Sequence, residues 1–170
     1  MARGRKLASL PKRLWACAAG AALVEFTIVA PFLFVLAFGM AEFGRFMYQH
    51  QLVQTGVRDA ARYLSRIADP NDVAEQTKAE NLALTGQVTS GGTLRVANWT
   101  AANINFVITS IPNAIDPGTG ASPYRGANPL LVIEVSTNWT FTDALGVHGF
   151  LGIGSGITVN VTHEERHISE

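Results

Sequence analysis

The hydrophobic pattern is dominated by one apolar run near the N-terminus. From Trp15 to Ala41 the only charged side chain is that of Glu25. As a helix, the uncharged residues 26–41 would rise about 24 Å and residues 15–41 roughly 40 Å, while the hydrocarbon core of a bilayer is about 30 Å thick. The run therefore predicts a membrane-spanning helix, and the alternative is a buried core helix of a soluble protein.

After this run the pattern becomes amphipathic. Apolar residues recur at helical spacing from Phe43 to Leu64, and charged residues such as Arg58 fall between them. One helix over about residues 21–66 would thus have an apolar first half and an amphipathic second half. We expect the apolar stripe of the second half to pack on the chain's own sheet, and a surface for a partner helix is the other interpretation.

The remaining pattern predicts one short helix and a small sheet. Asp69 followed by Pro70 is typical of a helix start and Gly86 of a helix end, which together predict a helix over residues 70–84. Apolar residues then alternate, as in strands with one buried face. The strands are expected over residues 104–108, 131–141 and 157–161, with a weaker one over residues 94–99. The fold class is therefore α+β, with the long N-terminal helix packed on a small antiparallel sheet of three or four strands.

Two segments between the strands have the composition of loops. Residues 110–129 contain four prolines and three glycines, so we expect a long exposed loop there. Residues 145–156 are rich in glycine but also apolar. This composition favours a contact loop that either docks on the domain's own core or binds a partner.

The net charge of zero hides a strong segregation. Five basic residues and no acidic residue precede Gly20, which leaves 8 basic and 13 acidic residues for the rest of the chain. Basic residues before a span place the N-terminus in the cytoplasm and the bulk of the chain outside. A nucleic-acid-binding arm is disfavoured because an apolar run follows the basic residues. A secretory signal peptide is disfavoured because the small residues precede the apolar run.

These features divide the chain into four segments. They are a basic cytoplasmic leader (residues 1–20), a transmembrane helix (21–41), an amphipathic helix that continues it (42–68) and an external α+β head domain (69–170). Because Cys17 is the only cysteine, an intramolecular disulfide is excluded and the head depends on packing alone.

Glu25 requires a physical explanation, because a lone carboxylate inside a bilayer costs at least about 2.5 kcal/mol. One explanation is a positive partner. If a peptidase cut the chain after Gly20, the new amino terminus on Ala21 would lie about one helical turn from Glu25, or from the same residue of a neighbouring subunit. The other explanation is that Glu25 reaches the cytoplasmic interface and leaves only residues 26–41 in the hydrocarbon core.

The segment from Gly20 to Ser65 contains a specific pattern of residues: Gly20, Ala21, Glu25, Phe26 and Pro31, then Glu42, Phe43, Gly44 and Arg45, and finally Ala60, Ala61, Arg62 and Tyr63. With this pattern the segment resembles the TadE-like family of tight-adherence (Tad, Flp-type) pilus assembly. The resemblance implies cleavage by a prepilin peptidase between Gly20 and Ala21, with Glu25 at the fifth position of the mature chain. It also implies a minor component, because Flp-type major pilins are much shorter and have tyrosine where this chain has Phe26.

The resemblance further implies a pilin-like arrangement in the bacterial inner membrane, with the head in the periplasm. A minor pseudopilin of this kind would prime or cap a pilus through helix packing, with Glu25 and Phe26 setting the helix register and Pro31 kinking the helix. The implied partners are other pseudopilins, the Flp-type pilin, the prepilin peptidase, the inner-membrane platform proteins and the lipid bilayer, with no nucleic acid. The alternative within the same machine is an uncleaved membrane-anchored scaffold similar to TadG.

Catalytic chemistry has little support in the sequence. His163, Glu165 and His167 would share one face of a strand, so a membrane-tethered metal-binding domain is a further alternative. However, no second group of ligands is apparent. Neither a Gly-x-Ser-x-Gly pattern nor a phosphate-binding loop occurs. We therefore expect no enzymatic activity, no cofactor and no metal.

Overall fold

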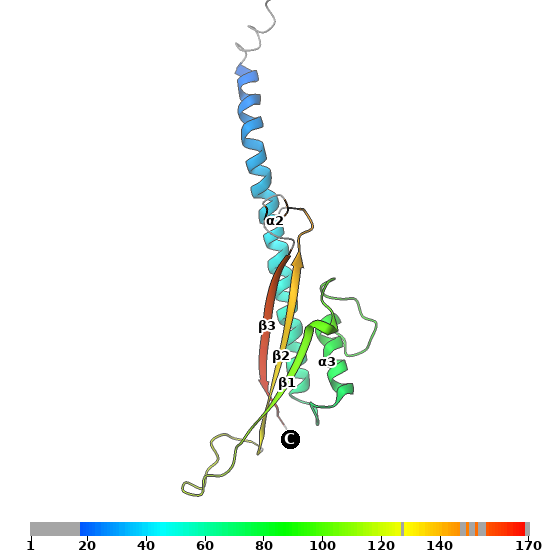
Figure 1. Cartoon of the computed structure of the whole chain (residues 1–170), viewed down its shortest axis with the longest axis vertical. Helices are drawn as coiled ribbons and strands as arrows, with labels where there is room; N and C mark the ends of the chain where they lie inside the picture. Colours follow the sequence, from blue (N-terminus) through cyan, green and yellow to red (C-terminus); the bar gives the residue numbers. More distant parts are fainter. Residues whose placement is uncertain (1–17, 127, 147–148, 150–151, 153–155, 169–170) are drawn as a thin grey trace, which may run out of the picture.

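A computed structural model describes residues 18–126, 128–146, 149, 152 and 156–168. Figure 1 shows a long helix that packs on a small sheet and extends far beyond it, with a second, short helix beside its lower half. The elements are α2 (Ala18–Leu64), α3 (Val73–Thr85), a 3-10 turn η2 (Ala101–Asn103), β1 (Ile104–Ile111), β2 (Leu130–Thr142) and β3 (Gly156–Arg166). The predicted α+β fold class is confirmed. The basic leader lies almost entirely outside the described residues, as does most of the predicted contact loop after Leu145.

The predicted single long helix is confirmed as α2, which starts and ends slightly earlier than expected. Its 47 residues make it about 70 Å long at 1.5 Å per residue. Pro31 lies inside it, and the helix continues on both sides of that residue.

The two halves of α2 have different surroundings. Among the described residues, α2 is the one helix that is long and apolar enough to cross a bilayer. Its large apolar side chains from Leu23 to Met40 are exposed, and residues 20–41 rise about 33 Å, close to the thickness of a hydrocarbon core. The second half packs on the head. The residues of this half that are fully buried are Val53, Val57, Ala60, Ala61 and Leu64.

The start of α3 differs from the prediction. The helix begins at Val73, and its N-cap is Asp72, whose Oδ1 accepts the main-chain N–H of Ala74 at 2.9 Å. Asp69, which was expected to be the cap, instead accepts the N–H of Asn71 at 2.9 Å and forms the turn before the helix. The predicted end is confirmed, because Gly86 closes α3 in the left-handed conformation with φ of 79°.

The weak strand expected over residues 94–99 is wrong. Val96 and Trp99 are buried in the core without joining a ladder, whereas Leu94 is exposed. Trp99 donates its indole N–H to Thr137 Oγ1 at 2.9 Å. The ring fits there because Gly56 of α2 has no side chain. A Cβ at that position would lie 2.6 Å from Trp99 Cη2 and 2.5 Å from the carbonyl oxygen of Ala83.

The sheet has three antiparallel strands in the order β1-β2-β3. β2 is central, with Ile108 of β1 opposite Ile133 on one side and Val159 of β3 opposite Trp139 on the other. One face of β2 is buried under α2 through Ile133, Val135, Trp139 and Phe141. The opposite face is polar.

The two ends of the sheet carry different loops (Figure 1). β2 ends and β3 begins at the end nearer the exposed half of α2, and the loop over residues 112–129 lies at the other end. The sequence predicts this loop from residue 110, whereas Ser110 and Ile111 pair with β2 and belong to β1. The described residues of the rest of the loop contain no helix or strand, and most are exposed. Asn113 is the exception. It is 2% exposed, and its side chain bonds to the main chain of Tyr124 and Gly126.

Candidate functional site

The contact between α2 and the end of β2 has an unusual buried charge. Glu42 follows the predicted span directly and is only 4% exposed. Its Oε2 accepts Arg45 Nε at 3.0 Å, and its Oε1 accepts the main-chain N–H groups of Leu145 at 2.9 Å and Ala144 at 3.2 Å. A buried carboxylate is stable when hydrogen bonds replace its hydration, as these do. We refer to Glu42, Arg45, Thr142, Ala144 and Leu145 as the junction.

Arg45 extends the junction to the strand itself. It lies one helical turn after Glu42, so both side chains project from the same side of α2. Its Nη2 donates to the carbonyl oxygen of Thr142 at 2.5 Å, and its guanidinium carbon lies 4.7 Å from the centroid of the Phe141 ring. This cation–π contact covers the end of the hydrophobic core that faces the exposed half of α2.

The turn after β2 is shaped to present its main-chain N–H groups to Glu42. Asp143 Oδ1 accepts the N–H groups of Leu145 at 2.9 Å and Gly146 at 3.0 Å, and Gly146 has φ of 71°. Such a turn is an Asx-type turn, and the positive φ favours glycine. The N–H of Leu145 is therefore shared between the carboxylates of Glu42 and Asp143.

The predicted processing and register residues lie elsewhere, in the exposed half of α2. Ala21, Glu25 and Phe26 are all exposed. Glu25 has no ion-pair partner among the described residues. The bond between Gly20 and Ala21 lies within the described part of the helix.

The remaining predicted positions on α2 are divided between the core of the head and the exposed surface of the helix. Ala60 and Ala61 are fully buried in the core, where small side chains let α2 approach its neighbours closely. Arg62 is exposed, with its Nε 3.6 Å from Glu165 Oε1 on β3. Phe43 and Gly44 are exposed on α2, and a Cβ on Gly44 would meet nothing within 4 Å.

The histidine cluster at the C-terminus is brought together only in part. His163 Nε2 lies 3.0 Å from Glu165 Oε1, and this hydrogen bond is the largest cause that lowers the pKa of Glu165. His167 instead contacts the carbonyl oxygen of Ile67 through Nε2 at 2.7 Å. The described residues hold no group of three or more His, Cys, Asp or Glu side chains placed to bind a metal.

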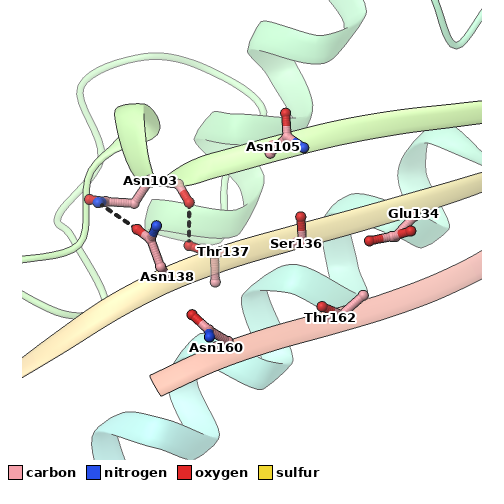
Figure 2. Close-up of a pocket in the computed structure, with 8 residues that line it drawn as sticks. All are labelled: Asn103, Asn105, Glu134, Ser136, Thr137, Asn138, Asn160 and Thr162. Carbon is pink, nitrogen blue, oxygen red and sulfur yellow. Dashed lines mark hydrogen bonds between the residues drawn. The ribbon is translucent and has the colours of Figure 1, made fainter. Parts of the chain in front are cut away.

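The outer face of the sheet is a second candidate site, which the sequence reasoning missed. A shallow hollow of about 410 Å³ lies there, and Figure 2 shows the side chains that line it. Its lining is Asn103, Asn105, Glu134, Ser136, Thr137, Asn138, Asn160 and Thr162. Asn103 Nδ2 donates to Asn138 Oδ1 at 3.1 Å, and Thr137 Oγ1 donates to the carbonyl oxygen of Asn103 at 2.8 Å. The signal was present in the sequence, since amide and hydroxyl residues alternate with the apolar ones along β2.

These features define a class of protein: an α+β head on a single long helix whose exposed apolar half has the length and composition of a membrane anchor. Residues 20–62 match the family model described as TadE-like protein, so the resemblance seen in the sequence is confirmed and this segment is TadE-like. The family implies involvement in Tad pilus assembly and is not known as enzymatic. No curated protein and no solved structure matches the chain.

The matched segment ends inside α2, so the family covers only one side of the junction. Glu42 and Arg45 lie within it, whereas Thr142, Ala144 and Leu145 lie far outside. Glu42 and Arg45 thus contact residues that lie outside the matched segment.

Proposed function

We propose that the chain is a minor pseudopilin that primes or caps a Tad (Flp-type IVc) pilus through packing of its N-terminal helix. The exposure of the first half of α2 carries this proposal. Large apolar side chains over about 33 Å of helix would be buried in a soluble protein, whereas here they are free to contact lipid and then neighbouring helices. The Tad pilus context comes from the TadE-like segment.

The orientation follows from charge. The five basic residues before Gly20 hold the N-terminus in the cytoplasm, and the head faces the periplasm from the inner membrane. The partners in this arrangement are other pseudopilins, the Flp-type pilin, the prepilin peptidase and the inner-membrane platform proteins.

Glu25 supplies the register in this proposal. Cleavage between Gly20 and Ala21 creates an amino group about one turn from Glu25, in the same chain or in a neighbouring one. The attraction between these charges is strong in a medium of low dielectric constant, so subunits align where the two groups meet.

Mass spectrometry of the N-terminus tests the processing step. Protein taken from membranes that contain the prepilin peptidase should begin at Ala21, and protein from a strain without the peptidase at Met1. A Met1 start in both strains would contradict the pseudopilin function.

Pilus counting by electron microscopy tests the role of Glu25. The Glu25→Ala variant should produce few or no pili while its membrane level remains normal. Thr27→Ala is the matched control, because the Thr27 hydroxyl bonds within its own helix to the carbonyl oxygen of Leu23 at 2.7 Å. Normal piliation of the Glu25→Ala strain would remove the basis of the register model.

One observation favours the uncleaved scaffold as a second candidate. The bond between Gly20 and Ala21 lies within a turn of the described part of α2, so it is helical. A peptidase would have to unwind this turn to reach the bond. An intact Met1 on a chain that is still required for piliation would support the scaffold.

A further inference from the structure

The junction, which includes the turn after β2, lies at the place where a membrane anchor would leave the bilayer. We propose that this turn is a second membrane contact, which inserts Leu145 into the headgroup layer beside α2. The inference rests on the proposed membrane anchoring of α2, and its partner is the lipid surface itself.

Position along the helix is the first support. Residues 20–41 fill about 33 Å, so Glu42 is at the border of the hydrocarbon core. The layer of headgroups extends roughly 5–8 Å beyond that border on each side. Because the N–H of Leu145 lies 2.9 Å from the Glu42 carboxylate, the turn is held within this layer.

The second support is the direction of the sheet. β2 ends at Thr142, next to the exposed half of α2 (Figure 1), and Arg45 holds that end to the helix. The head therefore turns this end toward the bilayer. The loop over residues 112–129 is at the far end and faces away from it.

The third support is the chemistry of the side chains that surround the junction. Leu145 is 54% exposed although its backbone is fixed by two carboxylates. Phe43, which follows Glu42 directly on α2, is also exposed. Leucine, aromatic rings and a nearby arginine are typical of protein surfaces at a membrane interface. Exposed apolar side chains are stabilised when they leave water, and insertion into the headgroup layer would provide this.

The fixed backbone makes the proposal testable with side-chain variants. Glu42 and Asp143 bond to main-chain N–H groups, so replacing the side chain of Leu145 leaves these contacts in place. A fluorescent probe at this position therefore reports where the turn lies without dismantling the junction.

The experiment uses the full chain with Cys17→Ser, reconstituted in phosphatidylcholine nanodiscs. A single cysteine, introduced as Leu145→Cys, is labelled with the polarity-sensitive dye NBD. Part of the phosphatidylcholine is then replaced by lipid that carries a nitroxide quencher, near the headgroup for positions 145 and 115 and partway along the acyl chain for position 34. Ile115→Cys in the distal loop is the matched control, because Ile115 is 66% exposed in the native chain. Phe34→Cys in the apolar half of α2 reports anchoring itself.

We expect the probe at position 145 to lose roughly half or more of its emission to the nitroxide lipid, and the probe at position 115 to lose roughly a tenth or less. Iodide, a quencher that stays in water, should give the reverse order. Equal behaviour of positions 145 and 115, with position 34 still quenched by nitroxide lipid, would overturn the inference and leave anchoring intact. Failure of quenching at position 34 as well would instead contradict membrane anchoring and with it the proposed function.

Discussion

Glu42 Oε1 accepts the main-chain N–H of Leu145 at 2.9 Å, a contact between residues 103 positions apart in the chain. It joins α2 to the turn after β2 through a main-chain N–H, so it does not depend on the side chain of Leu145. The contact thus depends on the carboxylate and on the conformation of the turn.

Removal of this carboxylate should destabilise the junction. Glu42→Ala leaves Arg45 without its carboxylate partner and the Ala144 N–H without its acceptor, while the Leu145 N–H keeps only Asp143, so we expect a loss of about 1–3 kcal/mol in the free energy of unfolding. Thermal unfolding of the full chain in nanodiscs, followed by the fluorescence of buried Trp99 and Trp139, measures it. Glu42→Gln keeps an acceptor oxygen and should lose less. Equal stability of the native chain and the Glu42→Ala variant would show that the buried charge adds nothing to folding.

Much of the fold could be predicted because its elements have strong periodic patterns. The long helix, the three strands and the cap at Gly86 each follow from local sequence. The start of α3 was misplaced because Asp69 and Asp72 both suit a cap, and only the packing of the preceding turn decides between them. The apolar residues of the segment 94–99 resemble a strand in sequence, whereas tertiary packing places the Trp99 ring against Gly56 in the core.

Only the α2 residues of the junction could be predicted from the sequence. Glu42 and Arg45 could be singled out by resemblance, but nothing in their spacing shows that they contact residues 142–145. Such a contact depends on the register of β2 and on the position of the helix over the sheet, which are long-range properties. Glu25 is the opposite case, because its importance was inferred from charge and its proposed partner belongs to a processed or neighbouring chain.

Gly56 should be intolerant of any side chain. In Gly56→Ala the new Cβ would lie 2.5 Å from the carbonyl oxygen of Ala83 and 2.6 Å from Trp99 Cη2, so the helices must separate. We expect a loss of about 1–3 kcal/mol in the free energy of unfolding. Gly44→Ala is the matched control on the same helix, with open space around it and an expected gain of about 0.5–1 kcal/mol. Thermal unfolding of both variants should shift in opposite directions, and a shared direction would contradict the packing argument.

Asn113 should control the order of the distal loop without controlling the fold. Asn113→Ala removes the side-chain bonds to the main chain of Tyr124 and Gly126, at 2.9 Å to the Tyr124 N–H and carbonyl oxygen. Local opening should then become about tenfold more frequent, with little change in global stability. Limited trypsin digestion measures this opening as the rate of cleavage after Arg125. Asn105→Ala, on the outer face of the sheet, should cleave at the native rate. An unchanged rate in the Asn113→Ala variant would show that other contacts hold the loop.

Glu165 should contribute to the pH dependence of stability at the edge of the sheet. The hydrogen bond from His163 is the main cause that lowers the pKa of Glu165 from its ordinary value of 4.5, and Arg62 acts in the same direction. A carboxyl whose pKa is lower in the folded state stabilises the fold above its unfolded pKa and loses that contribution as the pH falls through the folded pKa. The native chain should therefore lose stability on acidification below about pH 4.5, by less than about 1 kcal/mol for this partly exposed group. Glu165→Gln should lack this part of the acid transition, whereas Glu164→Gln, on the opposite face, should retain it. Urea unfolding at a series of pH values measures the difference. Identical profiles for the Glu165→Gln variant and the native chain would show that the contact between Glu165 and His163 does not cause the acid transition.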